Sequence, residues 1–151
     1  MNKTLEIKFE HYDSPDEMIC SDKALIGEAL AALATAHAPY SQFNVGAAAR
    51  LRSGEIVHAA NVESEAYPSG LCAERSLLYW LASNRAGDPV ETLAIASSPS
   101  ERECYPCGAC RQVLLDTERR QNSPIRIIMY GGGTASVVAS AGDLLPFAFI
   151  L

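Results

Sequence analysis

The sequence lacks long apolar runs and is poor in positive charge. No stretch approaches the roughly 18 apolar residues of a membrane-spanning helix, and residues 1–10 hold no apolar core of a signal peptide. Only 12 Lys and Arg stand against 18 Asp and Glu, so the formal net charge is −6 and nothing attracts nucleic-acid phosphates. These shortages predict a cytoplasmic protein that binds neither membranes nor nucleic acid and acts on a small, uncharged or cationic molecule.

Cysteines are also few, and their number is odd. The five are Cys20, Cys72, Cys104, Cys107 and Cys110. In an intracellular chain, their two-residue spacings favour metal binding over a disulfide framework. The 151 residues, 48% of them hydrophobic, fit one domain over 1–151 that buries a core without disulfides.

Hydrophobic periodicity predicts the first elements. Leu5, Ile7 and Phe9 alternate with charged residues, which is typical of a short edge strand, here within an N-terminal extension over 1–20. An amphipathic helix then follows a cap at Ser21 or Asp22 and stops before Pro39. Its apolar stripe comprises Ile26, Ala29, Leu30, Leu33 and His37.

The rest of the chain alternates strands and helices. Hydrophobic periodicity and turn residues predict strands over 45–51 and 55–60, a helix from Cys72, a strand over 92–96, a helix from Pro106 to about 120, and strands over 125–130 and 135–138. The helix at Cys72 carries a stripe of Ala73, Leu77, Trp80 and Leu81. This order predicts an α/β layered domain with a mixed sheet.

Three cysteines have the spacing of a catalytic zinc site. Cys107 and Cys110 form a CxxC pair at one expected helix start, and Cys72 lies at another. Three thiolates fill three zinc positions and leave the fourth to water, while helix N-termini help to keep thiols deprotonated. The formal charges of the metal and three thiolates sum to −1, so we expect a cation near the site, and Arg75 is adjacent in sequence. The alternative is that Arg75 forms an ion pair at the surface.

Glu74 follows the lone cysteine by two residues. Helical side chains tilt toward the N-terminus, so a glutamate in the first turn can lean over a metal held there and carry protons. The alternative is a glutamate that only stabilises the helix dipole.

Two other metal sites remain as alternatives. Cys104 and Cys107 form a second CxxC pair, so a closed structural site of four cysteines is possible. An iron–sulfur cluster is disfavoured, because Leu114 stands where a fourth cysteine would be needed.

The segments Cys72-Ala73-Glu74 and Pro106-Cys107-Gly108-Ala109-Cys110 match the zinc-deaminase signature, with cysteine in place of histidine. Residues 38–48 and 61–71 resemble the small cytidine deaminases, and the resemblance runs from about Asp22 to Leu151. It implies a three-layer α/β/α sandwich with a mixed five-stranded sheet, a last helix at Leu144-Leu145-Pro146, zinc, and a homotetramer. A homodimer remains possible.

The resemblance also implies roles for single residues. Glu74 would take a proton from the zinc-bound water and deliver it to the ring nitrogen and the leaving amine. Phe43 would pack the base, Asn61 and Glu63 would bind the ribose hydroxyls, and Ala73 would contact the substrate. Phe149 would reach the base pocket of a neighbouring subunit. The pattern alone, without the resemblance, favours a core position for Phe43.

The chain departs from the family at Ser64 and Glu65, which follow the ribose-binding glutamate, and in its short C-terminus. We expect Glu65 to disfavour 5′-phosphorylated nucleotides. The predicted function is hydrolytic deamination of cytidine and deoxycytidine in pyrimidine salvage. Rival interpretations are a deaminase of a cytosine nucleoside antibiotic of the blasticidin type and a structural zinc module.

Overall fold

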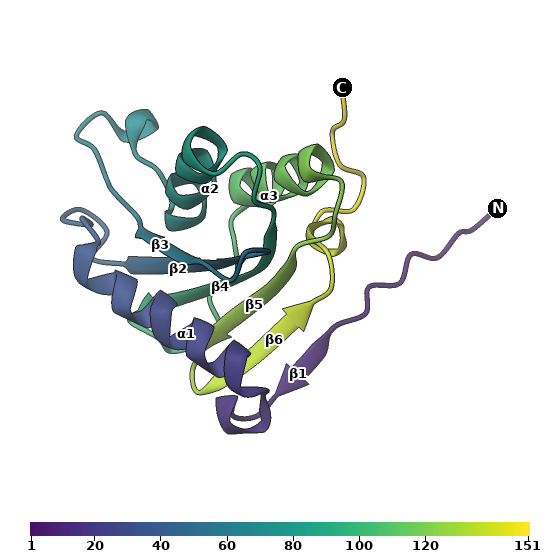
Figure 1. The fold of residues 1–151 in the computed structure, drawn as a ribbon, viewed down its shortest axis with the longest axis horizontal. Helices are drawn as coiled ribbons and strands as arrows, with labels where there is room; N and C mark the ends of the chain where they lie inside the picture. The colour runs from purple at the N-terminus through teal and green to yellow at the C-terminus, as the bar shows by residue number, and fades with distance from the viewer.

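The computed structural model describes residues 1–151 and is built on one six-stranded sheet, in the order β1-β6-β5-β4-β2-β3 (Figure 1). Only β4 and β5 pair in parallel; the other neighbours are antiparallel. The strands are β1 Glu10–Tyr12, β2 Asn44–Leu51, β3 Ile56–Ala60, β4 Val90–Ser98, β5 Arg126–Gly131 and β6 Thr134–Val138. The α-helices are α1 Cys20–Ala32, α2 Ala73–Asn84 and α3 Gly108–Gln121.

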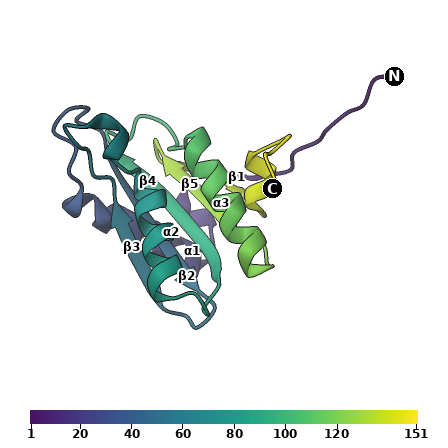
Figure 2. The ribbon, with the colours of Figure 1, turned by 90° about the horizontal axis from the view of Figure 1, so that it is seen from above.

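Helices cover both faces of the sheet. α1 packs on one face, and α2 and α3 lie side by side on the other (Figure 2). Because strand side chains alternate, Ala47 and Ala49 enter the core under α2 and α3, whereas Ala48 enters the core under α1. The α/β/α layers and the mixed sheet are confirmed. The number of strands was wrong: β1 adds a sixth strand to the five expected.

α1 lies very close to β2. A Cβ built on Gly46 would come within 2.0 Å of the carbonyl oxygen of Ala29, so this position admits only glycine at the observed spacing. Small residues around it, Ala29, Ala32 and Ala48, are fully buried. The close approach fixes α1 against the sheet and positions the loop that follows it.

The connections of β4 place two helix starts at one edge. α2 leads into the beginning of β4, and α3 forms the crossover from the end of β4 to the parallel β5. Both helices therefore begin near the edge where β4 ends, as parallel crossovers require. None of the helices has the length and apolar content that a membrane crossing needs.

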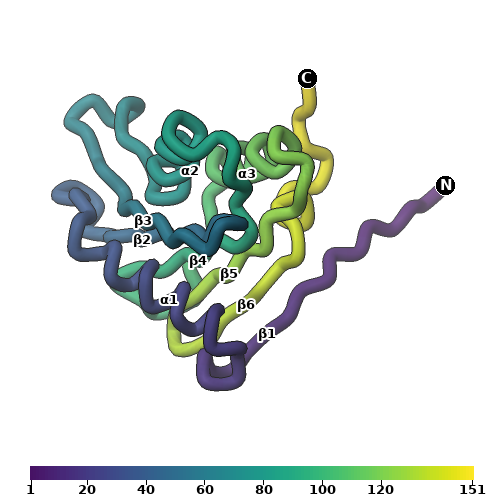
Figure 3. Tube along the Cα trace, viewed as in Figure 1, coloured from purple at the N-terminus to yellow at the C-terminus, as the bar shows by residue number.

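The N-terminal expectations were partly wrong. The edge strand is Glu10–Tyr12, whereas Leu5, Ile7 and Phe9 lie in an extended segment that leaves the sheet (Figure 3). α1 begins at Cys20, with Ile19 as its cap. Asp22 is no cap: it is 1% exposed and pairs with two arginines far along the chain. That ion cluster could not be read from the local pattern.

Three other expectations also differ from the structure. α1 ends at Ala32 in a short 3-10 turn, so His37 lies beyond the helix and is exposed. Trp80 is 44% exposed and stacks under Arg85, so it does not belong to the buried stripe of α2. No helix forms at Leu144-Leu145-Pro146; a 3-10 turn at Ala141–Leu144 takes its place.

Candidate active site

The fold brings Cys72, Cys107 and Cys110 together. Cys72 is the N-cap of α2 and Cys107 the N-cap of α3, and Cys110 lies in the first turn of α3. The Sγ atoms of Cys72 and Cys107 are 3.8 Å apart, those of Cys107 and Cys110 are 3.5 Å apart, and all three lie within 4.8 Å of one another. Soft thiolates in a three-ligand cluster suit zinc with one open position.

Cys104 does not join this cluster. It is buried, and desolvation raises the pKa of its thiol to about 11. The only grouping of His, Cys, Asp and Glu side chains that could hold a metal contains three cysteines, so a closed site with four cysteines is not what the structure forms. The chemistry of the donor set therefore fits an open zinc site.

The three thiols differ in their environments. Hydrogen bonding from Cys110, then from Arg75 and Cys107, lowers the pKa of Cys72 to about 5. The same hydrogen bond to Cys72, with burial, raises the pKa of Cys110. One thiolate is thus stabilised before any metal binds, and zinc would have to displace the proton that remains on Cys110.

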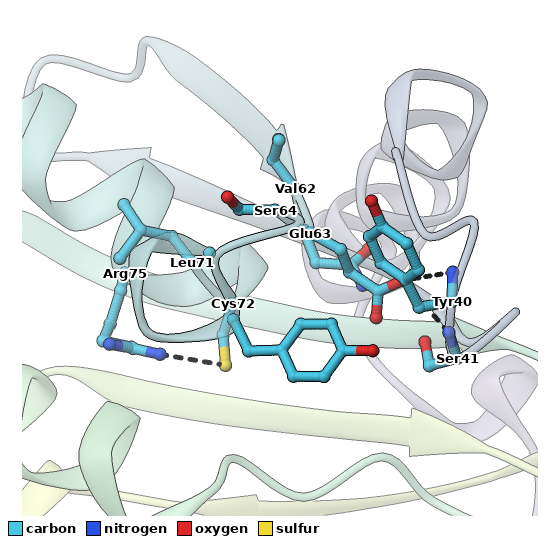
Figure 4. Close-up of a pocket in the computed structure, with 11 residues that line it drawn as sticks. Tyr40, Ser41, Val62, Glu63, Ser64, Leu71, Cys72 and Arg75 are labelled. Atoms are coloured by element: carbon cyan, nitrogen blue, oxygen red, sulfur yellow. Dashed lines mark hydrogen bonds between the residues drawn. The ribbon is translucent and has the colours of Figure 1, made fainter.

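Arg75 contacts the cluster directly. Its Nη2 donates to Cys72 Sγ at 3.4 Å (Figure 4), and it forms no ion pair with a carboxylate. Its Nε is buried without a hydrogen-bond partner. A guanidinium held in this way lowers the net negative charge of the three sulfurs.

Glu74 lies inside the first turn of α2, next to the sulfurs. It is 3% exposed, and desolvation raises the pKa of its carboxyl to about 7, helped by the charge of Cys72. A carboxyl that titrates near neutrality can both accept and donate a proton under ordinary conditions. Burial therefore gives Glu74 the properties of a general acid and base.

A cavity of about 470 Å³ opens beside Cys72 and Arg75 (Figure 4). This volume is in the range of small-molecule sites, about 300–1,000 Å³. The remaining lining comes from the loop after α1 and the loop between β3 and α2: Tyr40, Ser41, Asn61, Val62, Glu63, Ser64, Tyr67, Gly70 and Leu71. The cavity thus extends from Cys72, one member of the cysteine cluster, to the polar side chains of the two loops.

Glu63 and Asn61 hold the two loops in place. Oε1 of Glu63 accepts from the backbone N–H groups of Tyr40, at 3.0 Å, and Ser41, at 3.1 Å. These hydrogen bonds, of which the one from Ser41 has the larger effect, lower the pKa of Glu63. Asn61 Oδ1 accepts from Val45 N at 2.8 Å, and its Nδ2 donates to the carbonyl of Phe43 at 2.9 Å. Glu63 keeps Oε2 free for a ligand.

Some expected residues lie outside this cavity. Phe43 is 42% exposed, Ala73 is fully buried at the start of α2, and neither lines it. Phe149 is 69% exposed, with its carbonyl held by Gln112 Nε2 at 3.1 Å. Glu65 is also exposed and outside the lining.

Two tyrosines were missed by the sequence analysis. The rings of Tyr40 and Tyr67 pack edge to face with centroids 5.6 Å apart, and both line the cavity. Each lies in a segment without hydrophobic periodicity, and they are 27 positions apart, so the sequence does not indicate their contact. The one sequence signal for a role is their position within residues 38–48 and 61–71, the segments that resemble the small cytidine deaminases.

Comparisons with known proteins agree with this geometry. Residues 20–122 match the family model described as the cytidine and deoxycytidylate deaminase zinc-binding region. The chain is 39% identical over 129 residues to a cytidine deaminase of Mycobacterium tuberculosis, covering 83% of this chain and 86% of that protein. It is 35% identical over 127 residues to a cytidine deaminase of Halalkalibacterium halodurans, covering 83% of this chain and 91% of that protein.

Solved structures show the same likeness. The cytidine deaminase of Burkholderia pseudomallei superposes with a TM-score of 0.74 at 38% identity, over 87% of this chain and all of that chain. The cytidine deaminase of Mycobacterium tuberculosis superposes with a TM-score of 0.70 at 36% identity, over 89% of this chain and all of that chain. With three cysteines gathered at two helix starts and a buried glutamate beside them, the chain belongs to the cytidine and deoxycytidylate deaminase family.

Proposed function

We propose that the protein hydrolyses cytidine and deoxycytidine to uridine and deoxyuridine, with release of ammonia. The observation that carries this proposal is the buried Glu74 beside a cluster of three cysteines, one of which, Cys72, lines a nucleoside-sized cavity. The resemblance to cytidine deaminases over more than four-fifths of the chain supports the same reaction.

Cys72, Cys107 and Cys110 would hold zinc, which supplies Lewis acidity that makes a water molecule nucleophilic near neutral pH. Glu74 would take one proton from the attacking water and deliver it to the ring nitrogen, where it stays in the product. It would then carry the second proton of that water, from the oxygen added to the ring, to the amine, which leaves as ammonia. Its raised pKa, about 7, suits a group that must change protonation state within each turnover. Arg75, on Cys72 Sγ, offsets the negative charge of the thiolates.

The sugar would lie at the polar rim. Oε2 of Glu63 is free to accept from a ribose hydroxyl, and Asn61 has one N–H left after its bond to the Phe43 carbonyl. Phe43, which lies outside the cavity lining but is bonded through its carbonyl to Asn61, would pack the base, and Ala73 would contact the substrate through its backbone at the start of α2. The aromatic rings of Tyr40 and Tyr67 line the same cavity.

We also propose a homotetramer in which Phe149 of one subunit completes the pocket of another. Support comes from the exposed C-terminal side chains of Phe147 and Phe149, 99% and 69% exposed, which nothing in a single chain covers. Residues 1–151 would form one domain, since all six strands share a sheet. Five free cysteines without a disulfide support a place in the cytoplasm.

The alternatives have less support. A structural zinc site with four cysteines needs Cys104, which lies outside the cluster. Such a site would also give no functional reason for the burial of the Glu74 carboxyl beside the sulfurs. A cytosine antibiotic would draw on an acidic pocket, but Glu65 does not line the cavity.

Loss of cytidine absorbance on mixing with the purified, zinc-loaded protein tests the reaction. Release of one ammonia per uridine formed is expected. A protein that binds one zinc per chain but leaves cytidine and deoxycytidine unchanged would refute the proposed substrate.

A further inference from the structure

Residues 3–9, called here the N-terminal arm, precede the edge strand β1 and extend away from the sheet (Figures 1 and 3). The side chains of Leu5, Ile7 and Phe9 are 63%, 46% and 62% exposed. Residues 1–9 form no backbone hydrogen bond. The arm therefore exposes an unpaired backbone together with alternating apolar side chains, which is the usual template for addition of another strand.

Apolar and charged side chains alternate along the arm. Ile7 and Phe9 line a cavity of about 420 Å³ together with Leu144 and Pro146 of the same chain, and Leu5, Glu6 and Ile7 line another of about 500 Å³ with residues 142–147. Glu6 and Lys8 form no ion pair within the chain. A strand that pairs with the arm could thus bury its apolar side chains and place opposite charges beside Glu6 and Lys8.

We propose that the N-terminal arm pairs with the arm of a second copy of this chain, antiparallel, about a two-fold axis at Ile7. In this register Leu5 lies opposite Phe9 of the second copy, and Ile7 lies opposite its own equivalent. Glu6 lies opposite Lys8 of the second copy, and the axis repeats this unlike pair. Residues opposite each other share a face, so all six apolar side chains lie together.

The charges select this register. A shift of one residue sets apolar side chains against charged ones, and a shift of two sets Glu6 or Lys8 opposite its own equivalent. A parallel in-register pairing also opposes like charges. A shift of four pairs Lys8 with Glu10 but leaves Leu5 opposite Asp13. Only the register centred on Ile7 matches unlike charges and buries the three apolar residues of both arms.

Disulfide trapping tests the contact directly, whatever other faces associate. In Ile7→Cys the two new thiols lie opposite each other at a Cα separation of about 4.5–5.5 Å, which a disulfide can bridge. In the matched control Leu5→Cys the equivalent thiols are four residues apart along the strands, about 13 Å, and cannot be bridged. Oxidised glutathione is the oxidant, and the wild type shows the background from native cysteines.

Rapid formation of a linked dimer by Ile7→Cys, with only background linking by Leu5→Cys, supports the proposal. A mixture of Leu5→Cys and Phe9→Cys chains should form a linked heterodimer. Equal linking by Ile7→Cys and Leu5→Cys, or no linking by Ile7→Cys, would overturn it.

Charge reversal tests the register. In the Ile7→Cys background, Glu6→Lys or Lys8→Glu alone turns two unlike pairs into like pairs, and the linking rate should fall about ten-fold. The double reversal Glu6→Lys with Lys8→Glu restores unlike pairs and should restore the rate. Glu17→Lys, which makes the same charge change on an exposed residue outside the arm, should leave the rate unchanged. A double variant as slow as the single ones would overturn the proposed register.

Discussion

Replacement of Glu74 by glutamine separates proton transfer from metal binding. Glutamine has nearly the same volume and stays neutral, so the packing at this position, which is 3% exposed, should be kept. Glu74 is not among the three sulfur ligands, so Glu74→Gln should retain one zinc per chain.

The expected loss of activity follows from the chemistry that burial gives this carboxyl. A positioned general acid or base contributes about 10²–10⁴-fold, or about 3–5 kcal/mol of transition-state free energy. Because one residue serves several proton transfers, kcat should fall at least toward the upper end of that range. KM should change little, since Glu74 does not line the cavity that would receive the sugar.

The assay is the decrease in cytidine absorbance with zinc content measured on the same sample. Cys107→Ala is the matched comparison, because it removes a ligand of the cluster and should lose zinc as well as activity. A Glu74→Gln enzyme that holds zinc and turns over at close to the wild-type rate would refute the role given to this carboxyl.

Three further outcomes are expected. Arg75→Gln should lower kcat more than it raises KM, because the guanidinium contacts Cys72 Sγ; steady-state kinetics that show only a higher KM would point to substrate binding instead. Deletion of residues 149–151 should raise KM for cytidine with zinc content unchanged, and unchanged kinetics would remove Phe149 from the shared pocket. Gly46→Ala should lower the free energy of unfolding by about 1–3 kcal/mol, because its Cβ would meet the Ala29 carbonyl oxygen at 2.0 Å; a denaturant midpoint equal to that of the wild type would contradict this packing.

The metal cluster and its glutamate could be predicted from the sequence because their chemistry is local. A CxxC pair at a helix start sets Cys107 and Cys110 within one turn, and Glu74 follows Cys72 by two residues whatever the rest of the chain does. Alternating and helical periodicities likewise determined most strands and helices, since each depends on which neighbours along the chain are apolar. At the arm the same alternation predicted a strand, but residues 5–9 have no neighbouring strand within one chain.

Tertiary structure decided what lies far apart in sequence. Cys72 meets Cys107 only because α2 and α3 begin at the same edge of the sheet, 35 positions apart in the chain. Asp22 is buried between Arg50 and Arg126, and no local pattern indicates that a helix carboxylate will find two arginines on separate strands. The pKa of Glu74 is set by burial, a property of the packed core and not of its place in a motif. Sequence therefore determined which groups carry the chemistry, and the packing of helices on the sheet determined where those groups meet and how they ionise.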